Sequence, residues 1–314
     1  MKILGQEIKM GQSVQLKMDI AKLHTQTTIE IPVIVSRGKK AGPTLLLIAG
    51  IHGDEVNGVE IVRQIIAKKF HKPETGTVIC IPLVNVFGFL NQNREFPDGR
   101  DLNRVFPGSK TGSLASRFAY HLIQEIIPHI DYCIDFHTGG AQRFNVPHLR
   151  IAHDDETLAL AKIFNTKFIQ FTPQRDKTFR ETMVRLGKKV LLFEGGKSLN
   201  LTKSVSQTGV RGVLKVMTHL NMRNFESDIL QYPQAEIPII IKKSKWLRAK
   251  HSGMFRSHVK VGQFVLQGEI LGSISDPFGS FEKMVKNMTP GYILNANHSP
   301  IMNQGDALFH IGFE

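Results

Sequence analysis

Alternating apolar and polar positions near the start of the chain predict two β-strands. Residues 13–20 and 27–36 place hydrophobic side chains at about every second position. That period is typical of strands with one buried face and one solvated face. We predict that the two segments pair antiparallel at the edge of a mixed sheet.

Further along the chain, short apolar runs alternate with stretches of helical spacing. Continuous apolar runs bounded by turn residues indicate strands buried on both faces, as in parallel sheets. The predicted buried strands are 43–49, 77–81, 131–136, 149–152 and 190–193. The predicted helices are 56–69, 114–127, 155–167, 178–187 and about 204–223. This alternation predicts a three-layer α/β domain with a mixed, mostly parallel sheet.

After about residue 230 the helical spacing ends and glycine-rich strand patterns begin. Segments 252–274 and 290–311 form a weak internal repeat that resembles the half-motifs of a biotinyl/lipoyl-like barrel-sandwich domain. Such carrier domains present a modified lysine between the halves, but the sequence around Lys283 matches that motif poorly. We therefore predict two domains, an α/β domain at 1–230 and an unmodified all-β domain at 231–314.

Composition narrows the classes of partner. The chain has 40 Lys and Arg residues against 27 Asp and Glu, and a net charge of +13, which suggests nucleic acid, an anionic membrane or an anionic small molecule. The densest basic cluster, 242–251, contains a single aromatic residue, Trp246, so we interpret it as a solvated strand or linker surface rather than a nucleic-acid stripe.

Cys80 and Cys133 lie in apolar runs and are expected to be buried, reduced thiols. With no leader pattern and no apolar run long enough to cross a bilayer, we predict a cytoplasmic protein without membrane contact.

Candidate chemistry follows three of the predicted buried strands. His52 and Glu55 follow the first, His137 follows the third, and Glu194 follows the last. The carboxyl ends of parallel strands meet at one edge of a sheet, where ligands bind in open α/β folds. Two histidines and one glutamate are a ligand set for catalytic zinc with a position left for water, although another divalent ion is also compatible. Glu194 could accept the proton of that water, and Asp135 could orient His137.

The alternative for each of these residues is a structural one. An isolated histidine in a loop is usually a surface residue, and a glutamate at a strand end is usually a solvated carboxylate or a helix cap. The joint placement at matching strand ends favours a metal site over coincidence.

Segment 85–112 has no clear period, and a loop of that length inside a compact domain is usually functional. It contains Arg94, Arg100, Asn103 and Arg104 within a few residues. Guanidinium groups can bind a substrate carboxylate or stabilise an oxyanion. Alternatively, these arginines pair with acidic residues of the same loop, which we favour for Arg100 only.

Four motifs carry a resemblance to a known family. The chain contains GIHGDEVNG at 50–58, DGRDLNRVFPG at 98–108, DFHTGG at 135–140 and FEGG at 193–196. Together they resemble the succinylglutamate desuccinylase/aspartoacylase family, which is similar in fold to the zinc carboxypeptidases. The resemblance implies a deacylase in which a zinc-activated water attacks the amide bond of a small, anionic N-acyl amino acid or related N-acyl amine.

The resemblance also implies roles for individual residues. Zinc would be bound by His52, Glu55 and His137, and Glu194 would activate the water. A substrate carboxylate would be held by Asn103 and Arg104. Arg94 is the better match to the family's transition-state arginine, and Arg100 remains the alternative. A homo-oligomer is possible. The competing hypotheses are a metallocarboxypeptidase acting on short peptides and a non-catalytic binder of anions.

Overall fold

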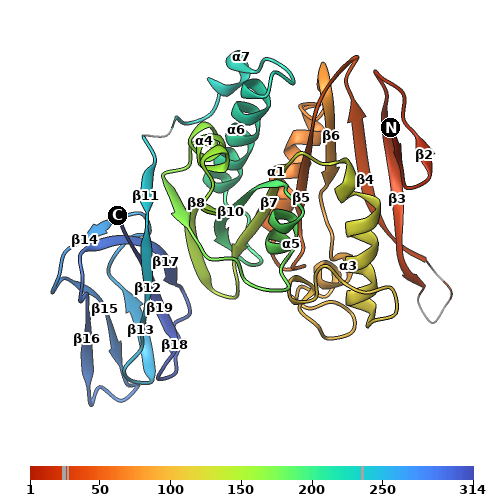
Figure 1. Ribbon diagram of the computed structural model, residues 1–314. Helices are drawn as coiled ribbons and strands as arrows, with labels where there is room; N and C mark the ends of the chain where they lie inside the picture. Colours follow the sequence, from red (N-terminus) through yellow and green to blue (C-terminus); the bar gives the residue numbers. More distant parts are fainter. Residues whose placement is uncertain (23–25, 27, 235–236) are drawn as a thin grey trace.

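The computed structural model describes residues 1–22, 26, 28–234 and 237–314. A central mixed sheet runs through the described chain in the order β12-β19-β17-β8-β10-β7-β5-β6-β4-β3 (Figure 1). Its strands before residue 230 are β3 (Ser13–Lys22), β4 (Thr28–Arg37), β5 (Lys40–Ala49), β6 (Thr75–Ile81), β7 (Tyr132–Gly139), β8 (Arg143–Ile151), β9 (Phe168–Phe171) and β10 (Lys189–Lys197). A small hairpin of β1 (Lys2–Ile3) and β2 (Gln6–Glu7) precedes them.

The predicted edge pair is confirmed, because β3 and β4 pair antiparallel at one end of the sheet. Residue 27, which we placed in the second of these strands, lies outside the described residues. The four strands β6, β5, β7 and β10 are mutually parallel, and β10 then pairs antiparallel with β8. The sheet is therefore mixed, with the parallel strands at its centre.

Helices cover both faces of the sheet. They are α1 (Val56–Ala67), α2 (Val86–Leu90), α3 (Leu114–Glu125), α4 (Asp155–Phe164), α5 (Phe179–Arg185), α6 (Lys203–His219) and α7 (Glu226–Ile229), with 3-10 turns η1 (Leu102–Arg104) and η2 (Ile127–His129). Strand β5 shows how the layers form. Its Leu46 packs in the core with Phe118 of α3, and its Leu47 packs in the opposite core with Ile61 of α1 and Val210 of α6. The predicted three-layer α/β architecture is confirmed.

Three local predictions were incomplete. The long loop contains α2 and η1, and β9 was not predicted. Strand β8 starts at Arg143, six residues before the predicted 149, although its first half contains polar residues and Pro147. Pairing with β10 on one side, and with β9 and β17 on the other, stabilises β8 where its local sequence does not indicate a strand.

The C-terminal strands are β11 (Ile239–Ile241), β12 (Lys243–Arg248), β13 (Gly253–Ser257), β14 (Phe264–Val265), β15 (Ile270–Ser275), β16 (Glu282–Lys286), β17 (Gly291–Asn297), β18 (Ile301–Met302) and β19 (Ala307–Phe313). The two repeat halves exchange strands reciprocally, because β14 of the first half pairs with β17 and β18 of the second half pairs with β13. The C-terminal region is therefore β-rich, as predicted, and its two repeat halves pair with each other. Lys283 lies within β16, opposite Ile274, rather than at a turn.

The C-terminal strands also extend the main sheet. Strand β17 lies beside β8 and pairs with it (Figure 1), and β11 pairs parallel with β9. The division into domains at 1–230 and 231–314 stays a prediction. Cys80 and Cys133 are buried and free, as predicted. None of the described helices combines the length and the apolar character needed to span a lipid bilayer.

Candidate metal centre and active site

The turn between β5 and α1 places His52 and Glu55 side by side. Gly50 adopts a φ of +65°, a left-handed conformation that a residue without a Cβ adopts without strain. A Cβ on Gly53 would lie 1.9 Å from the carbonyl carbon of Gly88, so only glycine lets the two loops approach this closely. The chain can therefore turn sharply and present both side chains at the sheet edge.

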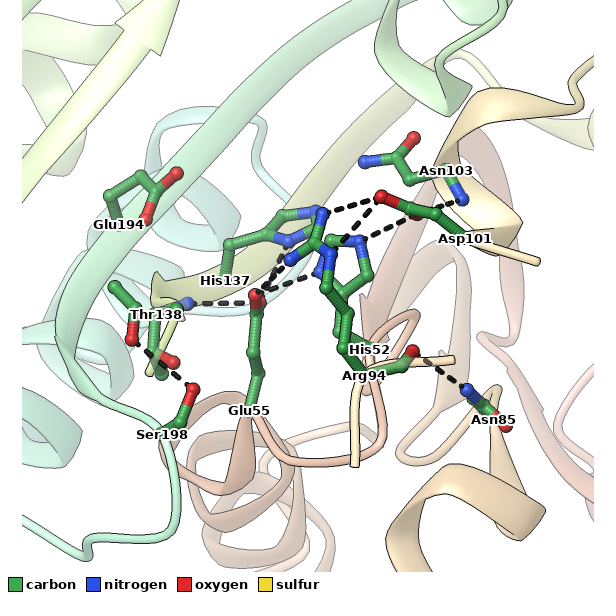
Figure 2. Close-up of polar contacts among 12 residues, drawn as sticks. His52, Glu55, Asn85, Arg94, Asp101, Asn103, His137, Thr138, Glu194 and Ser198 are labelled. Carbon is green, nitrogen blue, oxygen red and sulfur yellow. Dashed lines mark hydrogen bonds and ion pairs between the residues drawn. The ribbon is translucent and has the colours of Figure 1, made fainter. Parts of the chain in front are cut away.

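His137, at the end of β7, completes a buried cluster with His52 and Glu55. The carboxylate of Glu55 lies 2.8 Å from Nδ1 of His52 and 2.9 Å from Nδ1 of His137. One potential ligand atom from each residue lies within 4.8 Å of the others, and all three residues are buried. Figure 2 shows the two imidazoles converging on the Glu55 carboxylate.

The remaining ring nitrogens of the cluster face further carboxylates. Nε2 of His137 lies 3.0 Å from Oδ2 of Asp135, and Nε2 of His52 lies 3.2 Å from Oδ1 of Asp101. Carboxylates in these positions orient histidine ligands and raise their basicity. Burial alone would raise the pKa of the Glu55 carboxyl, but the two imidazoles hold that pKa well below its ordinary value.

This donor set fits a divalent metal ion. Two imidazoles and one carboxylate, with both Nδ1 atoms turned toward the same carboxylate, offer the nitrogen and oxygen ligands that zinc prefers. The surrounding carboxylates hold the rings in the orientation that leaves Nδ1 for a ligand. The three residues could therefore hold a metal ion, and its identity as zinc is taken up as a proposal below.

Arg94 and Arg100 lie in different environments. Arg94 donates to Oδ2 of Asp101 at 2.8 Å and to Oε1 of Glu55 at 3.3 Å, and it lines the cavity beside the cluster (Figure 2). The side chain of Arg100 is 59% exposed and pairs with Asp98 at 3.6 Å. Arg94 therefore lies where an oxyanion could be contacted, and Arg100 does not line that cavity.

Glu194, at the end of β10, lies beside His137 in the strand register. Its Oε1 lies 3.2 Å from Arg150, and its Oε2 accepts a hydrogen bond of 2.7 Å from Asn145. Figure 2 shows this carboxylate apart from the His52–Glu55–His137 network. Burial raises the pKa of Glu194, although Arg150 opposes that shift. A buried carboxylate of raised pKa beside a candidate metal site is suited to proton transfer near neutral pH.

Asn103 and Arg104 also line the cavity. Oδ1 of Asn103 accepts a hydrogen bond of 2.8 Å from the backbone N–H of Phe179, which fixes the amide of Asn103. Arg104 donates to the Asn103 carbonyl at 2.6 Å, and its side chain is 34% exposed. Both residues line the cavity, and their role as a carboxylate-binding pair stays a prediction.

The cavity has a volume of about 580 Å³ and a strongly basic lining. Among the described residues, six arginines line it: Arg94, Arg104, Arg143, Arg150, Arg175 and Arg180. Arg180 is buried, and its hydrogen bonds to Thr172 and to the carbonyl of Pro173 involve neutral groups. Burial, with a further contribution from Arg150, lowers the pKa of Arg180 to about 10. A ligand anion would compensate this buried charge.

Several cavity residues were missed by sequence reasoning. They are Asp101, Arg143, Asn145, Arg150, Arg175, Arg180, Trp246 and Asn295. Asp101 lies within the DGRDLNRVFPG motif, so this motif could have identified it as a cavity residue from the sequence. Trp246 and Asn295 come from the C-terminal strands β12 and β17, and their place at the cavity depends on tertiary contacts alone.

The fold and the cavity together define a protein with a mixed α/β sheet and a candidate His–Glu–His metal site at the carboxyl ends of its parallel strands. The catalytic-domain profile of the succinylglutamate desuccinylase/aspartoacylase family matches residues 41–220, more than half of the chain. This chain belongs to that family, as the four motifs predict, and it is an amidohydrolase that acts on N-acyl amino acids.

The individual relatives and solved structures described next share less than 30% sequence identity with this chain. The chain is 28% identical over 259 residues to the N-alpha-acetyl-L-2,4-diaminobutyric acid deacetylase of Halomonas elongata, covering 79% of this chain and 75% of that protein. A succinylglutamate desuccinylase/aspartoacylase structure from Rhodobacter sphaeroides superposes with a TM-score of 0.84 at 24% identity, over 100% of this chain and 99% of that one. The product-bound ectoine utilization protein EutE (DoeB) of Ruegeria pomeroyi gives a TM-score of 0.82 at 22% identity, over 96% and 95% of the chains. These structures support the fold.

Proposed function

We propose that this protein is a zinc-dependent deacylase that hydrolyses the amide bond of a small, anionic N-acyl amino acid. His52, Glu55 and His137 would hold the ion. The observation that carries the proposal is the placement of Glu194, which lies in register with His137 and lines the same cavity as the cluster. A cytoplasmic location and assembly into a homo-oligomer stay predictions.

The chemistry divides between the bound ion and the side chains around it. A divalent ion supplies Lewis-acid polarisation of the amide carbonyl and lowers the pKa of a water. Glu194 takes the proton of the attacking water on a carboxylate oxygen and delivers it to the leaving nitrogen. Arg94 faces the developing oxyanion, while Asn103 and Arg104 anchor the carboxylate of the amino acid.

Replacing each of the two candidate arginines by glutamine shows which of them contacts the oxyanion. Arg94→Gln should lower kcat by about 10²–10³-fold, as expected when one donor to an oxyanion is removed. Arg100→Gln should leave kcat within about twofold of the wild type, because Arg100 is exposed and pairs with Asp98. Steady-state kinetics of the two variants decides the matter, and a larger loss for Arg100→Gln would contradict the assignment.

The charge of the cavity favours substrates with an acidic group in addition to the amino-acid carboxylate. Arg180 is buried, and its hydrogen bonds go to neutral groups. Burial and Arg150 lower its pKa although Asp135 and Glu194 oppose that shift, so a second substrate anion would be stabilised there. The Halomonas elongata relative is named for the deacetylation of N-alpha-acetyl-L-2,4-diaminobutyric acid, which has an amino group instead, so this compound is the main alternative.

A substrate screen tests this preference. We would compare N-succinyl amino acids, N-acetylaspartate, N-acetyl-2,4-diaminobutyrate and short peptides with the zinc-loaded enzyme. We expect kcat/KM to be at least about 10-fold higher for the substrates with the extra acidic group, and Arg180→Gln to reduce that ratio. Equal or better cleavage of the diaminobutyrate compound would overturn the preference. Preferred cleavage of short peptides would support a metallocarboxypeptidase instead.

A further inference from the structure

Two buried amides connect Glu194 to the C-terminal strands. Nδ2 of Asn145 donates to Oε2 of Glu194 at 2.7 Å, and Nδ2 of Asn295 donates to Oδ1 of Asn145 at 2.7 Å. Asn145 lies on β8 and is 4% exposed, and Asn295 lies on β17 and is 1% exposed. The hydrogen-bonded series therefore begins in the C-terminal region and ends on the proposed catalytic carboxylate.

The chemistry of the three groups fixes the direction of these hydrogen bonds. An ionised carboxylate only accepts hydrogen bonds, so Asn145 must turn its NH₂ group toward Glu194. Its carbonyl oxygen then points the other way and needs a donor. Asn295 supplies that donor with its own NH₂ group. The carboxylate therefore sets the orientation of the Asn145 amide, and Asn295 stabilises that orientation by donating to the oxygen that faces away from Glu194, while Oδ1 of Asn295 has no hydrogen-bond partner among the described residues.

The backbone holds this arrangement in place. Asn145 pairs with Gly196 of β10 on one side and with Asn295 of β17 on the other. The register of β10 against β8 shifts between Glu194 and Gly196, which is a local irregularity at the point where the carboxylate enters the cavity. Side chains on paired strands are positioned more rigidly than side chains on loops.

The second oxygen of Glu194 is held differently. Its partner, Arg150, lies 3.2 Å away with a side chain that is 28% exposed. The Asn145 amide is thus the buried, neutral donor to Glu194, and its loss would leave Oε2 without that hydrogen bond in a water-poor environment.

We propose that Asn295 is a positioning residue for the hydrolysis, acting through Asn145 to hold the Glu194 carboxylate in its productive orientation. The C-terminal region then contributes to proton transfer as well as to the wall of the cavity. This inference rests on the proposed role of Glu194, and it assigns no contact between Asn295 and the reacting atoms.

The test compares isosteric and truncating substitutions in the full-length, zinc-loaded protein. Asn295→Ala removes the donor and should lower kcat by about 10-fold, with KM within about twofold of the wild type. An ionised Asn295→Asp keeps the shape but presents only acceptors, so it competes with Glu194 for the NH₂ group of Asn145 and weakens the hydrogen bond to Oε2. We expect a loss of about 100-fold in kcat for this variant.

Three controls separate positioning from general damage. Asn297→Ala removes another amide of β17, which donates to the carbonyl of Ala307, and should leave kcat unchanged. Metal content should be retained in both Asn295 variants, and a cooperative thermal melt should show that each still folds, although burying a carboxylate at this 1% exposed position should lower the melting temperature of Asn295→Asp. The double variant Asn145→Ala/Asn295→Ala should be no slower than Asn145→Ala alone, because Asn295 acts through Asn145.

The outcomes distinguish this inference from the proposed function. If Glu194→Gln is inactive but Asn295→Asp turns over like the wild type, the positioning role is wrong and the deacylase proposal stands. Independent, multiplying losses in the double variant would also overturn the positioning role. If Glu194→Gln is fully active, the proposed mechanism itself fails. A kcat loss of Asn297→Ala equal to that of Asn295→Ala would indicate a merely structural effect and overturn the inference.

Discussion

Replacing Glu194 by glutamine is expected to lower kcat by about 10²–10⁴-fold while the protein keeps its metal ion. Glutamine has nearly the same shape but cannot accept the proton of the attacking water, and general-base catalysis contributes a factor of that size. Glu194 lies beside His137 in the strand register but does not belong to the His52–Glu55–His137 cluster, so the ligand set is left intact. Steady-state kinetics and metal analysis of the same preparation measure both effects.

The pH dependence of the wild type provides a second readout of Glu194. Burial raises the pKa of this carboxyl, and the proton acceptor must be ionised to work. Activity should therefore be full above that pKa and fall as the pH drops through it, at a higher pH than for an exposed glutamate. The Glu194→Gln variant should lack this limb in its residual activity. Undiminished turnover by Glu194→Gln would refute the assignment.

Replacing His137 by alanine is expected to abolish both metal retention and hydrolysis. The variant loses one of three ligands and also leaves Asp135 buried without its imidazole partner. Breaking a buried charged pair typically costs about 3–5 kcal/mol, so the melting temperature should fall as well. Metal analysis after dialysis measures metal retention, steady-state kinetics measure hydrolysis, and a thermal melt measures stability.

His153→Ala is the matched control for this substitution. His153 is exposed and stacks on Phe171, away from the cluster. The control should keep its metal, its activity and nearly all of its stability. If His137→Ala retained a full equivalent of metal and hydrolysed substrate normally, His137 could not be a ligand.

The positions of the candidate ligands and of Glu194 could be predicted from the sequence because parallel strands make local patterns informative. His52, His137 and Glu194 each follow a buried apolar run, and the parallel pairing of β5, β7 and β10 brings such strand ends to one edge. The two-residue period of a strand also predicts that Asp135 and His137 point to the same side of β7, and Oδ2 of Asp135 lies 3.0 Å from Nε2 of His137.

The other half of the cavity could not be predicted in this way. Asn145, Trp246 and Asn295 reach it through antiparallel pairings between distant segments, and no local period specifies the partner of such a strand. Arg94 and Arg100 occur in one irregular loop, where spacing alone does not determine which side chain turns inward. For these residues, tertiary contacts determine whether the side chain faces the cavity, and the hydrophobic pattern of the sequence does not.

The central claim is that one divalent ion, held by two imidazoles and one carboxylate, is required for amide hydrolysis. The most direct measurement is a titration of chelator-treated protein with zinc while hydrolysis of an N-acyl amino acid is followed. We predict negligible turnover without metal, and a rise that saturates near one ion per chain in the wild type and is absent in His137→Ala. Full hydrolysis by protein shown to be metal-free would contradict the account.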